Sequence, residues 1–289
     1  MKKLNTILIV LILIFLVGCN PFNLSDPGRA VNFKQGHQQI DLKLVPNYPP
    51  SEIYENSQFM VLLELNNNLG YDVENLKLNL VGIDNKYFEV NNLQYEYFIG
   101  RMEGKSSFNP LGDKEWVEIS LISKELFENA RSFNNPFYIR ASYNSNFELS
   151  DSFCVNPSFY DFYGQGCKMD SRKRYSGQGA PVSVEEITTA VSPSGTGAYL
   201  RFNVIVKNRG NGKLNSLFLR EAKMGTESLE CNIIDSHAKM SKVFTEKDQE
   251  ARITCEVFLK DRVAYETLLY FNFDYEYNFQ IKGNLRLVN

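Results

Sequence analysis

Histidine is scarce in this chain, and its cysteines are not clustered. Only His37 and His237 occur among the 289 residues, and no two of the five cysteines form a C-x-x-C motif. Structural zinc sites use closely spaced cysteine and histidine, and neither histidine is spaced to join the cysteines. The sequence therefore predicts no metal site, and nothing in it points to a cofactor.

Long apolar runs are also missing. The longest, Ile7–Val17, has eleven residues, whereas a helix that crosses a membrane needs about 20. A run of this length behind Lys2 and Lys3 is typical of the hydrophobic region of a secretory signal. We therefore expect an exported protein whose body has no membrane-spanning helix.

Neither sign of charge dominates. The formal net charge is −3 at pH 7, and it becomes −5 when the first 18 residues, which include Lys2 and Lys3, are removed. Domains that bind nucleic acid carry a clear excess of basic residues. A nucleic-acid partner is therefore not expected.

Catalytic motifs are incomplete. Ser236 and Lys239 have the S-x-x-K spacing of penicillin-binding enzymes, but the S-D-N and K-T-G motifs of that site are absent. Gly210–Lys213 resembles a phosphate-binding loop only superficially, and its Asn and Gly residues favour a hairpin turn. We assign no catalytic residue and expect the chain not to be an enzyme.

The apolar run ends in Leu16-Val17-Gly18-Cys19, which resembles the lipobox of bacterial-type lipoproteins. The resemblance implies that a diacylglyceryl group is attached to Cys19, that residues 1–18 are removed, and that residues 19–35 form a lipid-anchored tether facing the extracytoplasmic side. An uncleaved anchor, or a secreted protein with a chance cysteine, is the alternative.

Four cysteines remain when Cys19 is set aside, and they allow three pairings. Export places them in a compartment where disulfides persist. We expect the nearest neighbours in the sequence to pair, Cys154 with Cys167 and Cys231 with Cys255. The first bridge would close a short loop, and the second would join two predicted strands.

The body of the chain reads as a succession of short strands. Polar and apolar residues alternate in many segments that are rich in Val, Ile, Phe and Tyr and separated by Asn, Gly and Pro. The strands expected in the first half are 39–44, 59–65, 73–81, 115–122 and 137–143. Only Lys124–Phe133 favours a helix, with Ser123 as its N-cap.

The same order of segments returns in the second half. Residues 199–212 repeat the residue pattern of 60–70, which is a strand followed by asparagine and glycine. Residues 269–279 repeat the alternating aromatic pattern of 137–147. The sequence therefore predicts an all-β fold of two tandem antiparallel β-sandwiches, because single sheets cannot bury their apolar faces alone. We expect the sandwiches at 36–153 and 181–289, joined by a disulfide loop and basic linker at 154–180.

Strands followed by Asn-x-Gly turns, in tandem copies behind an export signal, resemble immunoglobulin-like domains of the cell-adhesion-related, or CARDB-like, type. The resemblance covers residues 36–289. It implies spacer or adhesion modules of surface proteins, and it transfers no catalytic residue.

Residues near the expected joint between the halves are the candidates for binding. Aromatic side chains crowd the loop between Cys154 and Cys167, and basic side chains follow it. The candidates are Phe159, Tyr160, Phe162, Tyr163, Arg172, Lys173 and Arg174. The aromatic residues could form a binding finger, but packing at the domain joint is favoured. The basic run could contact an anionic polymer or the acidic face of a partner, but a solvated linker is the commoner explanation.

Together these features predict a non-enzymatic lipoprotein of the cell envelope that acts as a binding, adhesion or spacer module. Its partners would be the membrane, through Cys19, and a protein or surface polymer. An accessory subunit of an envelope transport or secretion complex is the alternative, and an extracellular hydrolase is a third hypothesis.

Overall fold

The computed structural model describes residues 32–127, 130–156, 167–195, 197–260 and 263–289. Within these residues Phe33–Asn289 form one compact unit. Its regular elements are strands, apart from a 3-10 turn, η1 (Asn91–Leu93), so the predicted all-β class is confirmed. No helix in the described part of the chain is long and apolar enough to cross a membrane.

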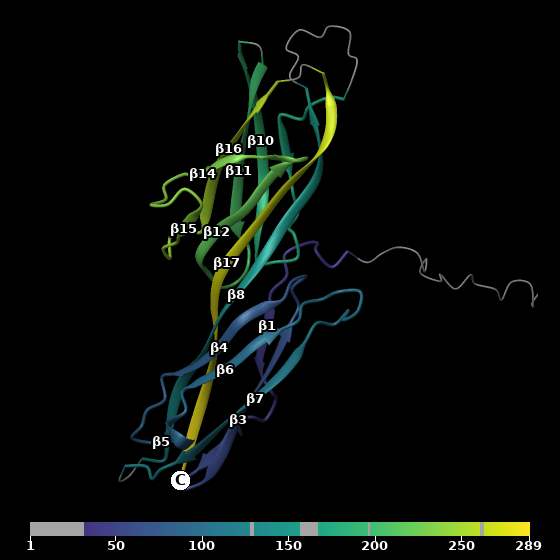
Figure 1. The fold of residues 1–289 in the computed structure, drawn as a ribbon. Coiled ribbons are helices and arrows are strands. Elements are labelled where there is room, and N and C mark those ends of the chain that lie inside the picture. The colour runs from purple at the N-terminus through teal and green to yellow at the C-terminus, as the bar shows by residue number, and fades with distance from the viewer. Residues whose placement is uncertain (1–31, 128–129, 157–166, 196, 261–262) are drawn as a thin grey trace, which may run out of the picture. The chain divides into compact units, whose positions relative to one another are not determined.

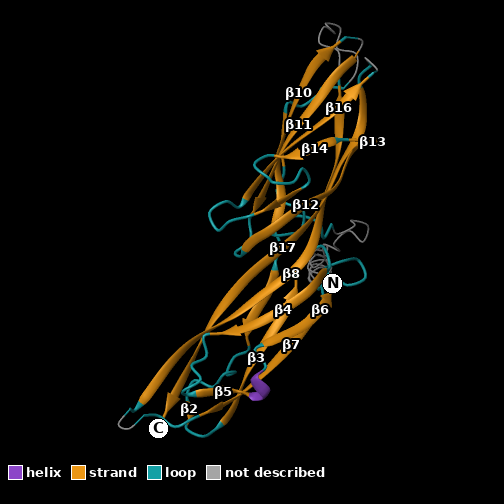
Figure 2. Ribbon diagram, turned by 60° about the vertical axis from the view of Figure 1, so that its left-hand side comes forward, coloured by secondary structure: helices purple, strands orange, loops and turns teal. Residues whose placement is uncertain are grey.

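The strands divide into two sets along the chain (Figures 1 and 2). The first set is β1 (Ile40–Leu44), β2 (Ile53–Tyr54), β3 (Gln58–Asn67), β4 (Val73–Val81), β5 (Phe88–Val90), β6 (Glu96–Met102), β7 (Lys114–Ser123) and β8 (Ser132–Val155). The second set is β9 (Arg172–Arg174), β10 (Val182–Ser194), β11 (Gly197–Asn208), β12 (Lys213–Met224), β13 (Glu227–Ser228), β14 (Glu230–Ile233), β15 (Ser241–Val243), β16 (Glu250–Leu259) and β17 (Tyr265–Val288).

Three sheets result. One has the order β1-β3-β7-β5, a second has the order β14-β16-β11-β10-β9, and the largest contains β13-β12-β17-β8-β4-β6 with β15 and β2 attached. All pairings are antiparallel except that of β2 with the end of β17. Strand residues alternate between buried and exposed, as in β3 and β7, because one face of each sheet lies on a shared apolar core.

Two 24-residue strands, β8 and β17, hold the largest sheet together. They pair along their whole length, from Ser132 opposite Val288 to Val155 opposite Tyr265, and Figures 1 and 2 show them side by side. Residues 279–288 consequently pair with residues 132–141 of the first half. One sheet therefore continues across the boundary expected between 36–153 and 181–289, because β8 of the first range pairs with β17 of the second. The division into two domains stays a prediction.

The strand pairing repeats in the two halves. β1-β3-β7-β5 has the same order as β10-β11-β16-β14, and β4 pairs with β8 as β12 pairs with β17. The ends of β3 and β11 also match, since Asn67 lies opposite Ile40 and Asn208 lies opposite Val182. This agreement supports the tandem duplication inferred from the sequence, with β8 and β17 as equivalent strands.

Aromatic residues of β8 and β17 form part of the core. Tyr143, Phe273 and Tyr277 are buried, and their rings contact rings of the other strand across the β8–β17 pair. Phe147 and Phe273 have centroids 4.9 Å apart, and Tyr143 and Tyr277 lie 5.7 Å apart. Rings at these distances stabilise a strand pair beyond the area that they bury.

The helix expected at Lys124–Phe133 is wrong. Residues 124–127 and 130–131 are irregular, and β8 already begins at Ser132. Ser123 does not cap a helix, because it ends β7 and its hydroxyl donates to the Tyr54 carbonyl at 2.5 Å and accepts from the Ser57 N–H at 2.9 Å. Tertiary hydrogen bonds thus use the side chain that the helix would have needed.

The hairpin turn expected at Gly210–Lys213 is also wrong. The strands on its two sides, β11 and β12, belong to different sheets, so the turn connects the two layers. The Asn208 side chain closes it, accepting from the Gly210 N–H at 3.0 Å and donating to the Gly212 carbonyl at 2.8 Å. An asparagine turn of this kind suits a layer crossing as well as a hairpin.

Both disulfides have the pairing expected from the sequence, Cys154 with Cys167 and Cys231 with Cys255. The second is a cross-strand bridge, because Cys231 of β14 lies directly opposite Cys255 of β16. Disulfides of this kind are typical of proteins from oxidising compartments.

Replacing both Cys231 and Cys255 by alanine should lower the free energy of unfolding by about 3 kcal/mol, because the bridge closes a loop with a sequence separation of 24 residues. Urea unfolding of the oxidised variant and wild-type proteins measures this difference. Equal midpoints would show that the pairing of β14 with β16 fixes this edge without the bridge.

Candidate binding site

Several residues predicted to function lie outside the described part of the chain. They are Cys19, Phe159, Tyr160, Phe162 and Tyr163. Their roles in lipid attachment and binding stay predictions. The bridge that flanks the aromatic loop is described, and the Cys167 Sγ atom lies 3.4 Å from the Tyr265 carbonyl at the start of β17.

The basic run forms the short edge strand β9 and is bonded within the protein. Arg172 and Arg174 both form ion pairs with Glu186, at 2.7 and 3.2 Å. Lys173 contacts Asp151 at 2.6 Å and the Ser152 carbonyl at 2.7 Å. Since these contacts hold β9 on the protein, the cations have a structural role, and binding by them stays a prediction.

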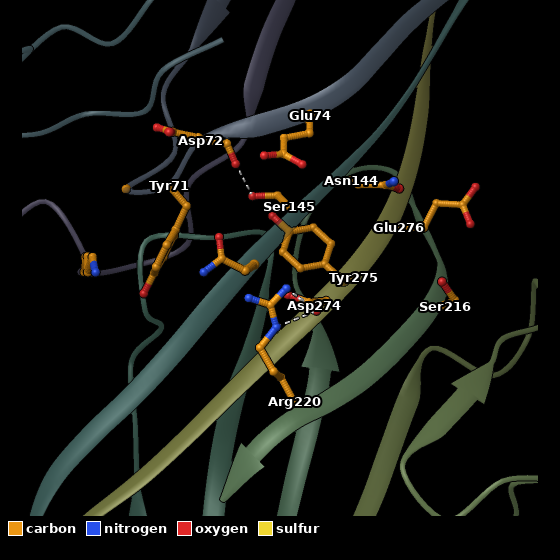
Figure 3. Close-up of a pocket in the computed structure, with 13 residues that line it drawn as sticks. Tyr71, Asp72, Glu74, Asn144, Ser145, Ser216, Arg220, Asp274, Tyr275 and Glu276 are labelled. Carbon is orange, nitrogen blue, oxygen red and sulfur yellow. Dashed lines mark hydrogen bonds and ion pairs between the residues drawn. The ribbon is translucent and has the colours of Figure 1, made fainter. Parts of the chain in front are cut away.

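A hollow in the described part of the protein lies elsewhere, where β4 begins beside β8. It has a volume of about 740 Å³, and Figure 3 shows the side chains that line it. β4 starts to pair with β8 at Val73, opposite Ser145. The part of β8 that follows Ser145, up to Val155, is therefore not paired with β4.

Tyr71, which precedes β4, covers the start of that edge. Its hydroxyl accepts a hydrogen bond from the Glu148 N–H at 3.1 Å and lies 3.4 Å from the Glu148 carbonyl. Lys34 adds an ion pair to the Glu148 carboxylate at 2.6 Å and lies over the Tyr71 ring. These contacts build one wall of the cavity.

Strand register brings two carboxylates into a row at the centre of the sheet. Glu74 of β4 lies opposite Asn144 of β8, which lies opposite Glu276 of β17. Directly opposed residues point to the same face of a sheet, and two strand spacings place Glu74 and Glu276 about 10 Å apart. We call Glu74, Asn144 and Glu276 the acidic row.

The cavity carries more negative than positive side chains. Asp72, Glu74, Asp274 and Glu276 line it with only two cations, Lys34 and Arg220. Figure 3 shows Arg220 bonded to Asp274, at 2.8 Å, and Asp72 is bonded to Arg101 at 2.6 Å. Within the described ranges, no cation lies at ion-pair distance from either glutamate of the acidic row.

The carboxylate of Asp72 is held in its charged form. Partial burial raises its pKa, but the Gly104 N–H at 2.9 Å and the Arg101 guanidinium outweigh burial, so that the pKa lies below its usual value. The hollow is therefore negative at neutral pH.

A buried hydroxyl borders the cavity without a partner. Tyr275 is 3% exposed, and neither its hydroxyl nor that of Tyr143 forms a hydrogen bond with the described residues. Figure 3 shows the Tyr275 hydroxyl beside Ser145. Burial raises the pKa of Tyr275 strongly, so this phenol stays protonated and can donate a hydrogen bond.

Tyr277→Phe should lower the free energy of unfolding by about 1 to 2 kcal/mol, whereas Tyr275→Phe should change it by less than about 0.5 kcal/mol. The Tyr277 hydroxyl accepts from the Gly212 N–H at 2.8 Å and donates to the Asn208 Oδ1 atom at 3.2 Å. Removing it leaves the Gly212 N–H without this partner, while the Asn208 Oδ1 atom keeps its bond from the Gly210 N–H. Urea midpoints of the two variants test this contrast, and an equal loss would mean that the Tyr275 hydroxyl is also bonded.

A second hollow, of about 560 Å³, lies at the equivalent place in the other half, where β12 begins beside β17. Its charged lining residues are Arg140, Lys213 and Glu246. Cations outnumber carboxylates here, so the duplicated positions have diverged to opposite charge.

The sequence did not identify either hollow. Glu276 is far along the chain from Asp72 and Glu74, the three form no motif, and only strand register brings the two glutamates together. The signal that could have located the hollows is the repeated asparagine turn after β3 and β11, because each hollow lies beside one of these turns.

Comparisons with known proteins add little. No protein-family model matches the chain, and a search of curated proteins found no match. The collagen adhesin of S. aureus aligns with 91% of this chain and 96% of its own, at 10% identity and a TM-score of 0.12. The MSCRAMM ACE of Enterococcus faecalis, which binds its ligands by the collagen Hug model, aligns with 90% and 98% at the same identity and TM-score. The all-β assignment rests on the strand pairing itself.

Proposed function

We propose that this protein is a non-enzymatic binding module of the cell envelope, held at the membrane by a lipid on Cys19, and that the acidic row binds a basic surface of a partner protein. The observation that carries the proposal is the alignment of Glu74 and Glu276 on one sheet face. Both side chains are exposed, and neither is neutralised by a described cation.

Rigidity of the surrounding sheet supports this function. Asn144 and Glu276 belong to the two longest strands, which pair along 24 residues. A site on such strands loses little conformational freedom when it binds. The two disulfides agree with a location outside the cytoplasm, and the lipobox-like segment provides the anchor.

The direct test is crosslinking on living cells. A photo-reactive amino acid at Ser216, which lies opposite Glu276, should capture the partner for identification by mass spectrometry. Capture of a protein with a basic surface supports the proposal. Capture of a wall polymer, or turnover of such a polymer by the purified protein, would contradict it.

Replacing Glu74 and Glu276 together by glutamine should lower the yield of the crosslinked partner roughly fivefold, since two exposed charge pairs contribute about 1 kcal/mol in total. High salt should have a similar effect on the wild-type protein.

Glu115 and Glu118 of β7 provide the matched control. Both are exposed glutamates on a strand, and replacing them by glutamine removes the same charge from another sheet. We expect capture to stay within twofold of wild type. An equal fall in both double variants would mean that net charge, and not the acidic row, governs capture.

A further inference from the structure

One sheet edge of the described protein has no neighbouring strand. β17 pairs with β12 as far as Asn278, opposite Lys213, and with β2 from Leu287, opposite Ile53. Between these points the described residues place no strand on its outer side, and β8 covers only its inner side. We call residues 279–286 the open edge.

Strand geometry shows which backbone groups face outward. In an antiparallel strand, the N–H and C=O groups of one residue point to the same side, and the side alternates along the chain. The backbone of Glu148 points away from β17, because it contacts the Tyr71 hydroxyl. The backbone N–H and C=O groups of odd-numbered residues of β8 therefore point toward β17. The register pairs these residues with odd-numbered residues of β17.

The backbone N–H and C=O groups of even-numbered residues of β17 consequently point away from β8. The Leu268 carbonyl, which accepts from the Gly225 N–H after β12, agrees with this assignment. On the open edge these residues are Gln280, Lys282, Asn284 and Arg286. Arg286 borders the pairing with β2 that begins at Leu287, which leaves Gln280, Lys282 and Asn284 as the positions clear of it. No described group bonds to their backbone N–H or C=O groups, so the edge offers three donors and three acceptors.

The equivalent edge of β8 is closed. Tyr71 covers Glu148, the Ser152 carbonyl accepts from Lys173 at 2.7 Å, and Cys154 carries a disulfide. The repeat places Gln280 and Asn284 at the positions of Glu148 and Ser152, and it places Gly212 at the position of Tyr71. The edge of β17 therefore has no side chain equivalent to Tyr71 that could cover it.

Charge identifies the kind of chain that fits. The side chains of Lys282 and Arg286 are exposed along the open edge, and Arg140 of β8 lies beside them, bonded to Gln280 at 3.3 Å. Arg286 is paired with Glu52 at 3.4 Å, so Arg140 and Lys282 provide the positive charge. The second hollow, in which Lys213 is paired with Glu246 and Arg140 is the remaining cation, lies at the Phe279 end of the open edge. Residues 277–289 include no aspartate or glutamate.

A second copy of this chain fits poorly. Two open edges paired antiparallel about Lys282 would place this lysine opposite its own copy, and like charges directly opposed destabilise a strand pair. Lysine on an edge strand is a common device against such self-pairing. An acidic strand meets no such penalty.

We infer that the open edge of β17 binds an extended acidic segment of a partner protein, which adds to the sheet as an antiparallel strand. Backbone hydrogen bonds from Gln280, Lys282 and Asn284 provide the binding, and Arg140 and Lys282 select acidic side chains. This site is separate from the acidic row and does not depend on it.

A labelled octapeptide of alternating valine and glutamate tests the inference in titrations of the full chain by fluorescence anisotropy. Binding should be at least tenfold tighter than that of the valine–lysine peptide. Amide exchange at Gln280, Lys282 and Asn284 should slow at least tenfold when the peptide is bound.

A peptide with alternate amides methylated provides a control that leaves the protein unchanged. Methylation of the amides that face the open edge should lower affinity at least tenfold, whereas methylation of the other set should have a smaller effect. Equal binding of both methylated peptides would overturn the inference.

Lys282→Pro removes an outward donor without removing a bond to β8 and should abolish peptide binding. The matched control is Ser150→Pro, at the equivalent position of the closed edge, which should bind like wild type when circular dichroism shows it folded. If that variant fails to fold, the methylated peptides decide the question.

Concentration-dependent dimers that Lys282→Pro abolishes would instead identify a second copy as the occupant. Glu74→Gln with Glu276→Gln should leave peptide binding unchanged, which separates this site from the acidic row.

Discussion

Phe202→Ala should lower the free energy of unfolding by about 3 to 5 kcal/mol, and the loss should appear in both halves of the chain. Phe202 belongs to β11 in the second half and is fully buried. Its ring packs edge-on against Phe153 of β8, with centroids 5.3 Å apart. Because β8 and β17 continue into the first half, we expect the destabilised sheets to unfold together.

The single tryptophan allows this to be measured. Trp116 lies in β7, in the first half, so its fluorescence reports on the half that does not contain the substitution. In urea, the Trp116 transition and the far-ultraviolet circular dichroism transition should shift to the same lower midpoint.

Phe59→Ala is the matched control in the first half. Phe59 is buried in β3 and packs against Phe88 at 5.8 Å, so its removal should shift both signals in the same way. If Phe202→Ala left the Trp116 midpoint unchanged, the halves would unfold independently, and the two-domain division expected from the sequence would describe the energetics after all.

Positions of strands could be predicted from the sequence because alternation is a local property. The strand expected at 73–81 is β4 without change, and those expected at 59–65 and 115–122 lie within β3 and β7. The cysteine pairs could be predicted as well, since neighbouring strands bring Cys231 and Cys255 together.

The lengths of β8 and β17 could not be predicted in this way. Pro136 and Gly283 are residues that usually interrupt strands, yet both lie inside these long strands and opposite partners in the register. A Cβ atom at position 283 would lie 2.2 Å from the Phe137 ring, so glycine here permits close packing and does not end the strand. Only the three-dimensional pairing distinguishes these roles.

The binding sites were missed for a related reason. The acidic row depends on the register of three strands, and neither Glu74 nor Glu276 has a local signature. The open edge depends on comparing the two repeats, where glycine at 212 replaces tyrosine at 71. The basic residues of β9, which the sequence suggested for binding, instead form ion pairs with Glu186 and Asp151.

Asn67→Leu should lower the free energy of unfolding by about 3 kcal/mol. Asn67 is fully buried at the end of β3. Its Oδ1 atom accepts from the Leu69 N–H at 3.1 Å, and its Nδ2 atom donates to the carbonyls of Tyr71 and Met102 at 3.2 and 3.1 Å. Leucine has a similar volume but leaves three buried backbone groups unbonded, and each costs about 1 kcal/mol or more.

Asn208→Leu is the matched control from the other repeat. Asn208 makes the equivalent turn contacts with Gly210 and Gly212, but it is only partly buried, so water can replace some of the lost bonds. We expect a smaller loss there, measured as the difference in urea midpoint. Equal losses would show that burial does not govern the cost of breaking the turn.

Asn67→Asp separates hydrogen bonding from shape. A carboxylate keeps the acceptor for Leu69 but directs negative charge at the Tyr71 and Met102 carbonyls, so burial and these carbonyls should raise its pKa in the folded state. A carboxyl group whose pKa is raised by folding destabilises the protein as pH rises, because the unfolded state then binds fewer protons. Relative to wild type at each pH, the loss from Asn67→Asp should therefore be larger at pH 7 than at pH 4, while the loss from Asn67→Leu should not depend on pH. A pH-independent loss from Asn67→Asp would mean that water reaches the turn and that Asn67 acts mainly through its shape.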